Sequence, residues 1–187
     1  MHYCDLEYLR RGSQVQQAAL QCLEAWDIMQ ILAPYSPILC GTVPLGIHLP
    51  DSDLDIICNV ADFSLFAQLL NRHFADLPGF SITRHPTLSP PALTAYFRTP
   101  HFPIEIFGQP LPVSEQYAYR HMVQEARIMA YADTAFRSEI IRLKQAGFST
   151  EEAFAQKLGI TGDPYEALLR LEDCEDEELQ QRLTRQS

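Results

Sequence analysis

The spacing of hydrophobic and polar positions divides the chain into a first part that mixes strands with helices and a second part that is helical. Runs typical of strands occur at residues 38–40, 53–60, 80–84, 93–98 and 102–107. Helical spacing occurs at residues 6–33, with a break near Arg11 and Gly12, at 63–74, and then at 114–131, 133–145, 149–158 and 164–183. This order of elements is typical of an α+β fold.

Polar residues at three of the predicted helix starts support these boundaries. Ser13 with Gln16, and Ser149 with Glu152, have the spacing of a capping box. Asp62 is placed to be the N-cap of the helix that follows it.

The length of 187 residues suits one domain, or one domain with a helical appendage. We expect residues 1–112 to form an α/β core with its N-terminal helices, and residues 113–187 to form a helical region packed on that core. No linker rich in proline, glycine or serine separates the two parts, so one single domain overall is the alternative.

The densest chemical pattern is a Gly-Thr pair followed by an Asp-Leu-Asp sequence. Gly41 and Thr42 follow the first predicted strand, and Asp53 and Asp55 open the second. Alternate side chains of a strand point the same way, so the two carboxylates share one face while Leu54 is free to be buried. Two carboxylates side by side repel each other unless a cation lies between them. The pattern therefore predicts a site for metal-bound phosphates.

A third carboxylate stands alone in an apolar run. Glu105 lies between Ile104 and Ile106 in the last predicted strand. Taken singly, Glu105 has the alternative interpretation of an edge-strand side chain facing water, and Asp53 with Asp55 that of turn or cap residues. A calcium loop of the EF-hand type is excluded, because the glycine and the bidentate glutamate that it requires are missing.

The order of Gly41, Thr42, Asp53, Asp55 and Glu105 resembles the signature of the nucleotidyltransferase superfamily, whose fold is DNA polymerase beta-like. That signature is a Gly followed by Gly or Ser, a spacer, Asp-x-Asp/Glu on a strand, and a third acid on a later strand. The threonine departs from it by adding a methyl group while keeping a hydroxyl. The runs Gly-Thr-x-Pro-Leu-Gly-Ile, Ser-Asp-Leu-Asp-Ile and Ile-Glu-Ile-Phe-Gly-Gln further resemble a small bacterial family with an uncharacterised domain of this type, domain of unknown function 4269.

The resemblance implies a nucleotidyltransferase-like mixed β-sheet flanked by helices, with a helical C-terminal half. It also implies transfer of a nucleoside monophosphate from an NTP to a hydroxyl acceptor, with Mg²⁺ or Mn²⁺ as cofactor. Asp53, Asp55 and Glu105 would be the catalytic residues and metal ligands, since an all-oxygen ligand set suits Mg²⁺. Gly41 and Thr42 would bind phosphates through an N–H group and a hydroxyl. The acceptor is left open among small molecules, proteins and RNA.

Four basic residues of the helical part are candidates for contacts with a triphosphate. Arg120 and Arg127 are two helical turns apart, as are Arg137 and Lys144. Ordinary surface charges paired with glutamates are the alternative for each of them. We retain Arg120 as the candidate nucleotide-binding residue.

Charge and hydropathy narrow the expected partners and location. The formal net charge of −10 opposes binding to long nucleic acid, because such binding depends on Lys and Arg. No apolar run is long enough to cross a bilayer and no basic secretory leader is present, so we expect a cytoplasmic protein without a membrane partner. The 5 cysteines form no Cys-x-x-Cys pairs, which favours free thiols over disulfides or structural zinc.

Two other functions are compatible with the same pattern. A noncatalytic binding or regulatory protein would keep the fold and bind a nucleotide without transferring it, although it would not need all three acids. A metal-dependent phosphodiesterase would use the same ligands with water as the acceptor.

Overall fold

The computed structural model describes residues 3 and 5–185, which divide into two compact units. The first unit runs to Gly46 and continues over Asp51–Tyr119. The second unit begins at Arg120 and also includes the connecting segment Ile47–Pro50. As a domain boundary, residue 112 remains a prediction.

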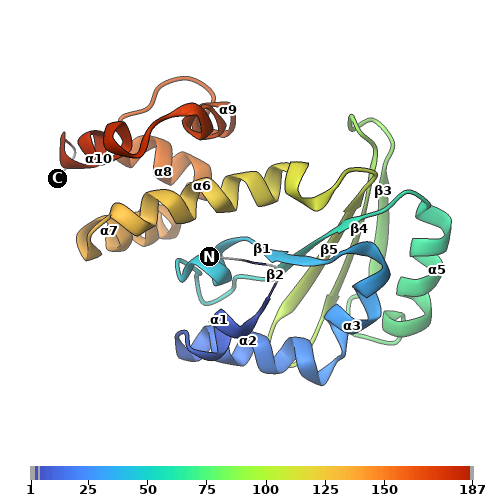
Figure 1. The fold of residues 1–187 in the computed structure, drawn as a ribbon. Coiled ribbons are helices and arrows are strands. Elements are labelled where there is room, and N and C mark those ends of the chain that lie inside the picture. The colour runs from blue at the N-terminus through green and yellow to red at the C-terminus, as the bar shows by residue number, and fades with distance from the viewer. Residues whose placement is uncertain (1–2, 4, 186–187) are drawn as a thin grey trace. The chain divides into compact units, whose positions relative to one another are not determined.

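The first unit is built on a five-stranded mixed sheet with the strand order β1-β2-β5-β4-β3 (Figure 1). The strands are β1 (Ile38–Cys40), β2 (Leu54–Asn59), β3 (Ser81–His85), β4 (Ala92–Arg98) and β5 (Pro103–Gln109). β2 and β5 run parallel, and the other neighbouring pairs are antiparallel. The predicted α+β fold with a mixed sheet is confirmed, and each predicted strand is present with small differences at its ends.

The helices of the first unit surround this sheet in chain order. They are α1 (Glu7–Arg10), α2 (Gln14–Ala25), α3 (Ile28–Leu32), α4 (Thr42–Leu45) and α5 (Phe63–Phe74), with 3₁₀ turns at Ala33–Tyr35 and Val113–Glu115. Figure 1 shows α2, α3 and α5 covering the sheet, and their apolar residues share one core with it.

That core fixes which side chains face away from the helices. Leu54 and Ile56 of β2, with Ile104 and Ile106 of β5, are fully buried in it together with Phe66 of α5. Burying a side chain of this size stabilises the fold by about 1.5–3 kcal/mol. Because successive strand residues point to opposite faces, the odd-numbered residues of β2 and β5 lie on the other face of the sheet.

The predicted helix starts are confirmed in detail. Ser13 and Gln16 form a complete capping box at α2, and Ser149 and Glu152 form another at α8. Asp62 caps α5 by accepting hydrogen bonds from two backbone N–H groups, at 2.8 and 3.0 Å. Each cap satisfies N–H groups that have no partner within their helix.

The second unit is helical, but the single helix predicted over residues 164–183 is wrong. Arg127 donates to the carbonyl of Leu171 at 2.8 Å, to the carbonyl of Cys174, and to the Asp176 carboxylate at 2.7 Å. These bonds stabilise a break in the helical path, since the two carbonyls are satisfied by a side chain. The elements are α6 (Tyr117–Tyr131), which begins in the first unit, then α7 (Thr134–Gln145), α8 (Thr150–Lys157), α9 (Pro164–Leu169), a 3₁₀ turn (Arg170–Asp173) and α10 (Asp176–Arg185).

Two expectations from composition can be compared with the structure. The cysteines that it describes with a side chain outside helix-end masking, Cys22, Cys40, Cys58 and Cys174, are free thiols, as predicted for them. Among the described residues, no helix combines the length and the apolar character needed to cross a membrane.

Candidate active site

Two of the predicted acids lie side by side at the centre of the sheet. Asp55 of β2 and Glu105 of β5 are direct partners in the parallel register, so their side chains leave the same face. The same row continues to Cys40 of β1 and to Tyr96 of β4. Burial raises the pKa of the Cys40 thiol, and the nearby Asp55 carboxylate adds to this effect. The row therefore gathers negative charge on the face opposite the helices.

Glu105 is on a central strand, so its interpretation as an edge-strand carboxylate is wrong. β5 has β2 on one side and β4 on the other. Burial raises the pKa of Glu105, and the Asp53 carboxylate raises it further, while His85 acts in the opposite direction. Asp53 itself immediately precedes β2 rather than lying within it. The three acids are thus close enough for their charges to interact along one edge of the β2–β5 pair.

Gly41 has a backbone conformation that favours glycine and a neighbour that excludes a side chain. Its φ and ψ angles are 79° and −154°, outside the regions that residues with a Cβ readily adopt. A Cβ atom on Gly41 would collide with Oδ2 of Asp55 and would lie 3.2 Å from its Cγ. The backbone of the Gly-Thr turn therefore packs directly against a carboxylate of the acid row.

Thr42 opens α4 next to a second hydroxyl group. Its Oγ1 lies 3.4 Å from Oγ of Ser52, the residue before Asp53. The turn after β1 and the entrance to β2 are therefore adjacent in space, although ten positions separate them in the chain. The sequence analysis did not single out Ser52 or His85, because an isolated serine or histidine carries no signal of such proximity.

The basic candidates belong to the second unit and have partners within it. Arg120 donates to both carboxylate oxygens of Glu172, at 3.0 and 2.8 Å. Lys144 is buried, and its Nζ donates to the carbonyl of Ile47 at 2.9 Å. A role of Arg120 in nucleotide binding remains a prediction.

A buried cluster of charges also lies in the second unit. Glu125 is fully enclosed, and burial raises its pKa well above the usual range, helped by Glu151 and opposed by Lys144. The His121 ring, which is itself buried, lies 3.5 Å from the Glu151 carboxylate. These groups connect α6, α7 and α8 by charge.

The donor chemistry of the acid row fits a divalent cation. Among the described residues, no three His, Cys, Asp or Glu side chains converge into a ready ligand cluster. Asp53, Asp55 and Glu105 nevertheless form a group of neighbouring carboxylates whose mutual repulsion raises the pKa of Glu105. A hard cation relieves that repulsion, and oxygen ligands are those that Mg²⁺ prefers. The three acids are therefore the residues that could hold such an ion.

A family model described as Domain of unknown function (DUF4269) matches residues 21–171. The chain belongs to the DUF4269 family. The matched range of this DUF4269 chain contains the whole acid row and the Gly-Thr turn. No curated protein matches its sequence.

Solved structures show that the DUF4269 chain has a nucleotidyltransferase-like fold. The GLD-2/RNP-8 complex aligns with a TM-score of 0.52 and 13% identity, over 90% of this chain and 64% of that one. The Cid1 poly(U) polymerase with Mg and 3′-dATP gives 0.51 and 15%, over 87% and 48%. A Cid1 complex with MgATP gives 0.51 and 16%, over 89% and 52%. The chain thus spans less than two thirds of the length of these proteins, and at such identity the likeness concerns the fold.

Proposed function

We propose that this protein is a metal-dependent nucleotidyltransferase that moves a nucleoside monophosphate from an NTP to a hydroxyl acceptor. The observation that carries the proposal is the direct pairing of Asp55 with Glu105 on the central parallel strands, with Gly41 packed against Asp55. A buried carboxylate pair costs free energy unless a ligand compensates it. Its presence at the centre of a sheet is therefore better explained by function than by stability.

Each residue has a role that follows from its position. Asp53, Asp55 and Glu105 would hold Mg²⁺ or Mn²⁺. The bound ion would lower the charge of the phosphates and favour the attacking hydroxylate. Glu105, whose pKa is raised by burial and by Asp53, is suited to accept the proton of the acceptor hydroxyl. The N–H group of Gly41 and the hydroxyl of Thr42 would bind phosphate oxygens.

The structural neighbours support an NTP as the donor. Two of the Cid1 structures contain a nucleotide together with Mg. They also bear on the acceptor, because Cid1 is described as a poly(U) polymerase. The expectation from net charge that long nucleic acid is excluded finds no support in these neighbours. RNA therefore stays among the proposed acceptors, beside small molecules and proteins.

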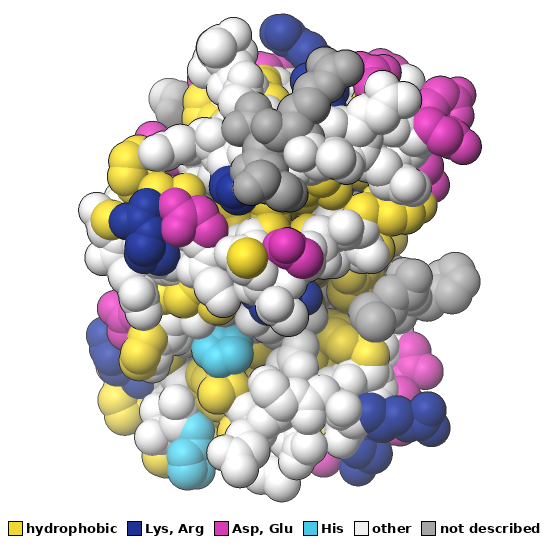
Figure 2. All heavy atoms as spheres, turned by 90° about the vertical axis from the view of Figure 1, so that its left-hand side faces the viewer, with side chains coloured by type: hydrophobic (Ala, Val, Ile, Leu, Met, Phe, Trp, Pro, Cys, Tyr) yellow, Lys and Arg dark blue, Asp and Glu magenta, His cyan; other side chains and the backbone are white. Residues whose placement is uncertain are grey.

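The surface charges do not select one acceptor. Figure 2 shows one face of the molecule, on which Lys and Arg side chains are scattered rather than gathered in one patch. Some of these side chains are held in ion pairs, as Arg142 is by Glu139 at 2.7 Å. A short RNA 3′ end needs fewer phosphate contacts than a long strand, and so needs a smaller basic surface.

The test is a transfer assay with matched variants. Purified protein is incubated with each α-labelled NTP, with Mg²⁺ or Mn²⁺, and with either short RNA oligonucleotides or fractionated cell extract. Asp55→Asn and Glu105→Gln should abolish label transfer, while Asp51→Asn should retain it, because Asp51 is an exposed acid in the same loop. All three variants should keep the circular dichroism spectrum of the wild type.

The outcomes separate the candidate functions. Label that enters one fraction with wild type and Asp51→Asn, but not with Asp55→Asn, supports transfer and identifies the acceptor class. Unchanged turnover in Asp55→Asn would refute the proposal. Metal-dependent NTP binding by the wild type without release of pyrophosphate, with every acceptor, would instead support the noncatalytic binding protein. Hydrolysis of a phosphodiester would support the phosphodiesterase.

A further inference from the structure

One side chain from α2 fixes the turn that carries Gly41. The side-chain amide of Gln16 donates one hydrogen bond to the carbonyl of Val43 and one to the carbonyl of Pro44, both at 3.0 Å. These carbonyls belong to α4, which is a single turn long. They point out of the last turn of a helix, where backbone carbonyls have no partner within the helix. Gln16 therefore satisfies both of them from a distant part of the chain.

The residues before Gln16 hold its side chain in this position. Its Oε1 accepts a hydrogen bond from the N–H of Ser13 at 2.9 Å, within the capping box of α2. A Cβ atom on Gly12 would collide with the same Oε1. The amide group is thus used completely, with its oxygen directed to the start of α2 and its nitrogen directed to α4.

The identity of the side chain at this position is informative. Glutamate and glutamine both complete a capping box, because each supplies the accepting oxygen. A carboxylate, however, has no N–H to donate, and its second oxygen would face two carbonyl oxygens. Only glutamine performs both tasks at position 16.

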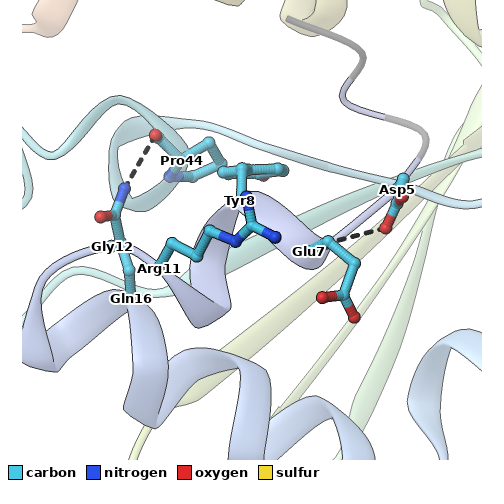
Figure 3. A pocket seen from close by; sticks show the side chains of 7 residues that line it. All are labelled: Asp5, Glu7, Tyr8, Arg11, Gly12, Gln16 and Pro44. Carbon is cyan, nitrogen blue, oxygen red and sulfur yellow. Dashed lines mark hydrogen bonds between the residues drawn. The ribbon is translucent and has the colours of Figure 1, made fainter.

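Packing does not hold α4 from this side. Figure 3 shows Gln16 reaching Pro44 at the border of a cavity, which Tyr8, Arg11 and Gly12 also line. The cavity has a volume of about 670 Å³. Since open space adjoins Pro44 here, the two hydrogen bonds of Gln16 are the contacts that restrain the turn.

We propose that Gln16 is a positioning residue for the metal site, acting through α4 and Gly41 on the Asp55 carboxylate. The Gly41 backbone leaves no room for even a methyl group next to Asp55. A shift of α4 would therefore change the space in which this carboxylate can be oriented toward a metal. The inference rests on the proposed function, because it assumes that Asp55 is a metal ligand.

The test compares Gln16→Glu with Gln14→Glu. Both substitutions add one negative charge in the first turn of α2, but Gln14 is exposed and has no part in the capping box. Gln16→Glu keeps the capping oxygen and removes the two N–H donors. We expect it to weaken Mn²⁺ binding about tenfold, the loss typical when a residue that supports a ligand is removed. Gln14→Glu should bind Mn²⁺ like the wild type, and both variants should melt at similar temperatures.

Two further readouts distinguish positioning from a general loss of structure. Hydrogen exchange at the amides of α4 should become faster in Gln16→Glu, while exchange in β4 stays unchanged. The Mn²⁺ affinity of Gln16→Glu relative to wild type should recover toward about pH 5, because a protonated glutamate, with an ordinary pKa of about 4.3, can again donate to a carbonyl.

Each outcome decides a separate question. Wild-type Mn²⁺ affinity in Gln16→Glu would overturn the positioning role and leave the proposed function intact. The same would follow if α4 exchanged faster while metal affinity stayed unchanged. A wild-type protein that binds neither Mn²⁺ nor a nucleotide would refute the proposed function, and the positioning role with it.

Discussion

The contact between Gly41 and Asp55 can be tested by placing a single methyl group between them. In Gly41→Ala, the new Cβ would lie on Oδ2 of Asp55 and 3.2 Å from its Cγ. The obstacle is the end of a short side chain, so we expect the carboxylate to rotate rather than the sheet to separate. The variant should therefore fold, with Asp55 turned away from Glu105.

The expected magnitude has two parts. An alanine with φ near 79° costs about 1–3 kcal/mol of backbone strain. Forcing Asp55 away from its preferred rotamer adds about 0.5–1.5 kcal/mol. Gly79→Ala isolates the first part, because Gly79 has a similar φ of 72° and the only nearby atom, Cε1 of Tyr96, is at 4.0 Å. Both glycines lie in the first unit, so the unfolding free energies can be compared directly.

The assay is urea denaturation of four proteins: wild type, Gly41→Ala, Gly79→Ala, and Gly41→Ala in an Asp55→Ala background. Gly41→Ala should be less stable than Gly79→Ala, and the excess should disappear when Asp55 has no carboxylate. Its Mn²⁺ affinity should fall about tenfold or more, while that of Gly79→Ala stays unchanged. Equal stability of the two alanine variants, within the error of about 0.5 kcal/mol, together with wild-type Mn²⁺ affinity, would refute the reasoning.

Three further substitutions test the electrostatics and the caps. Folding raises the pKa of Glu125, so the folded protein holds this proton more tightly than the unfolded chain does. Wild-type stability should therefore fall as the pH rises above about 4.3, and Glu125→Gln should lose this slope and be the more stable protein near about pH 7 in urea titrations. Lys144→Met leaves the buried carbonyl of Ile47 without its ammonium donor and should cost about 1–3 kcal/mol, whereas Lys157→Met should change stability by less than about 0.5 kcal/mol in the same measurement. Asp62→Ala should lower the unfolding free energy by about 1 kcal/mol, and an unchanged melting temperature would show that its cap is dispensable.

The parts of the fold that depend on nearby residues could be predicted from the sequence. The capping boxes at Ser13 and Ser149 and the N-cap at Asp62 involve side chains within three positions of the N–H groups that they satisfy. The strands likewise follow from local alternation of apolar residues. The break at Cys174 could not be predicted in this way, because it depends on Arg127, which lies in another helix.

The position of Glu105 shows the same limit for the candidate site. Alternation around Ile104 and Ile106 establishes which face the carboxylate occupies, and the structure agrees. The same alternation would be found on an edge strand, so it cannot distinguish an edge from the centre of a sheet. That distinction depends on the parallel pairing of β5 with β2, which joins residues fifty positions apart.

The connection between the Gly-Thr turn and the acids raises a further physical question, which is how irregular backbone is held in place. Between α4 and β2 the carbonyls of Val43, Pro44 and Ile47 accept hydrogen bonds from side chains, two of them from Gln16 and one from Lys144. Buried carbonyls need partners, and a connection without regular structure offers few of its own. The donors come from 27 and 97 positions away. Such restraints leave no periodic trace in a sequence, yet they determine how closely Gly41 approaches Asp55. The residue types of the site are therefore legible in the chain, while its geometry depends on donors that only the folded structure identifies.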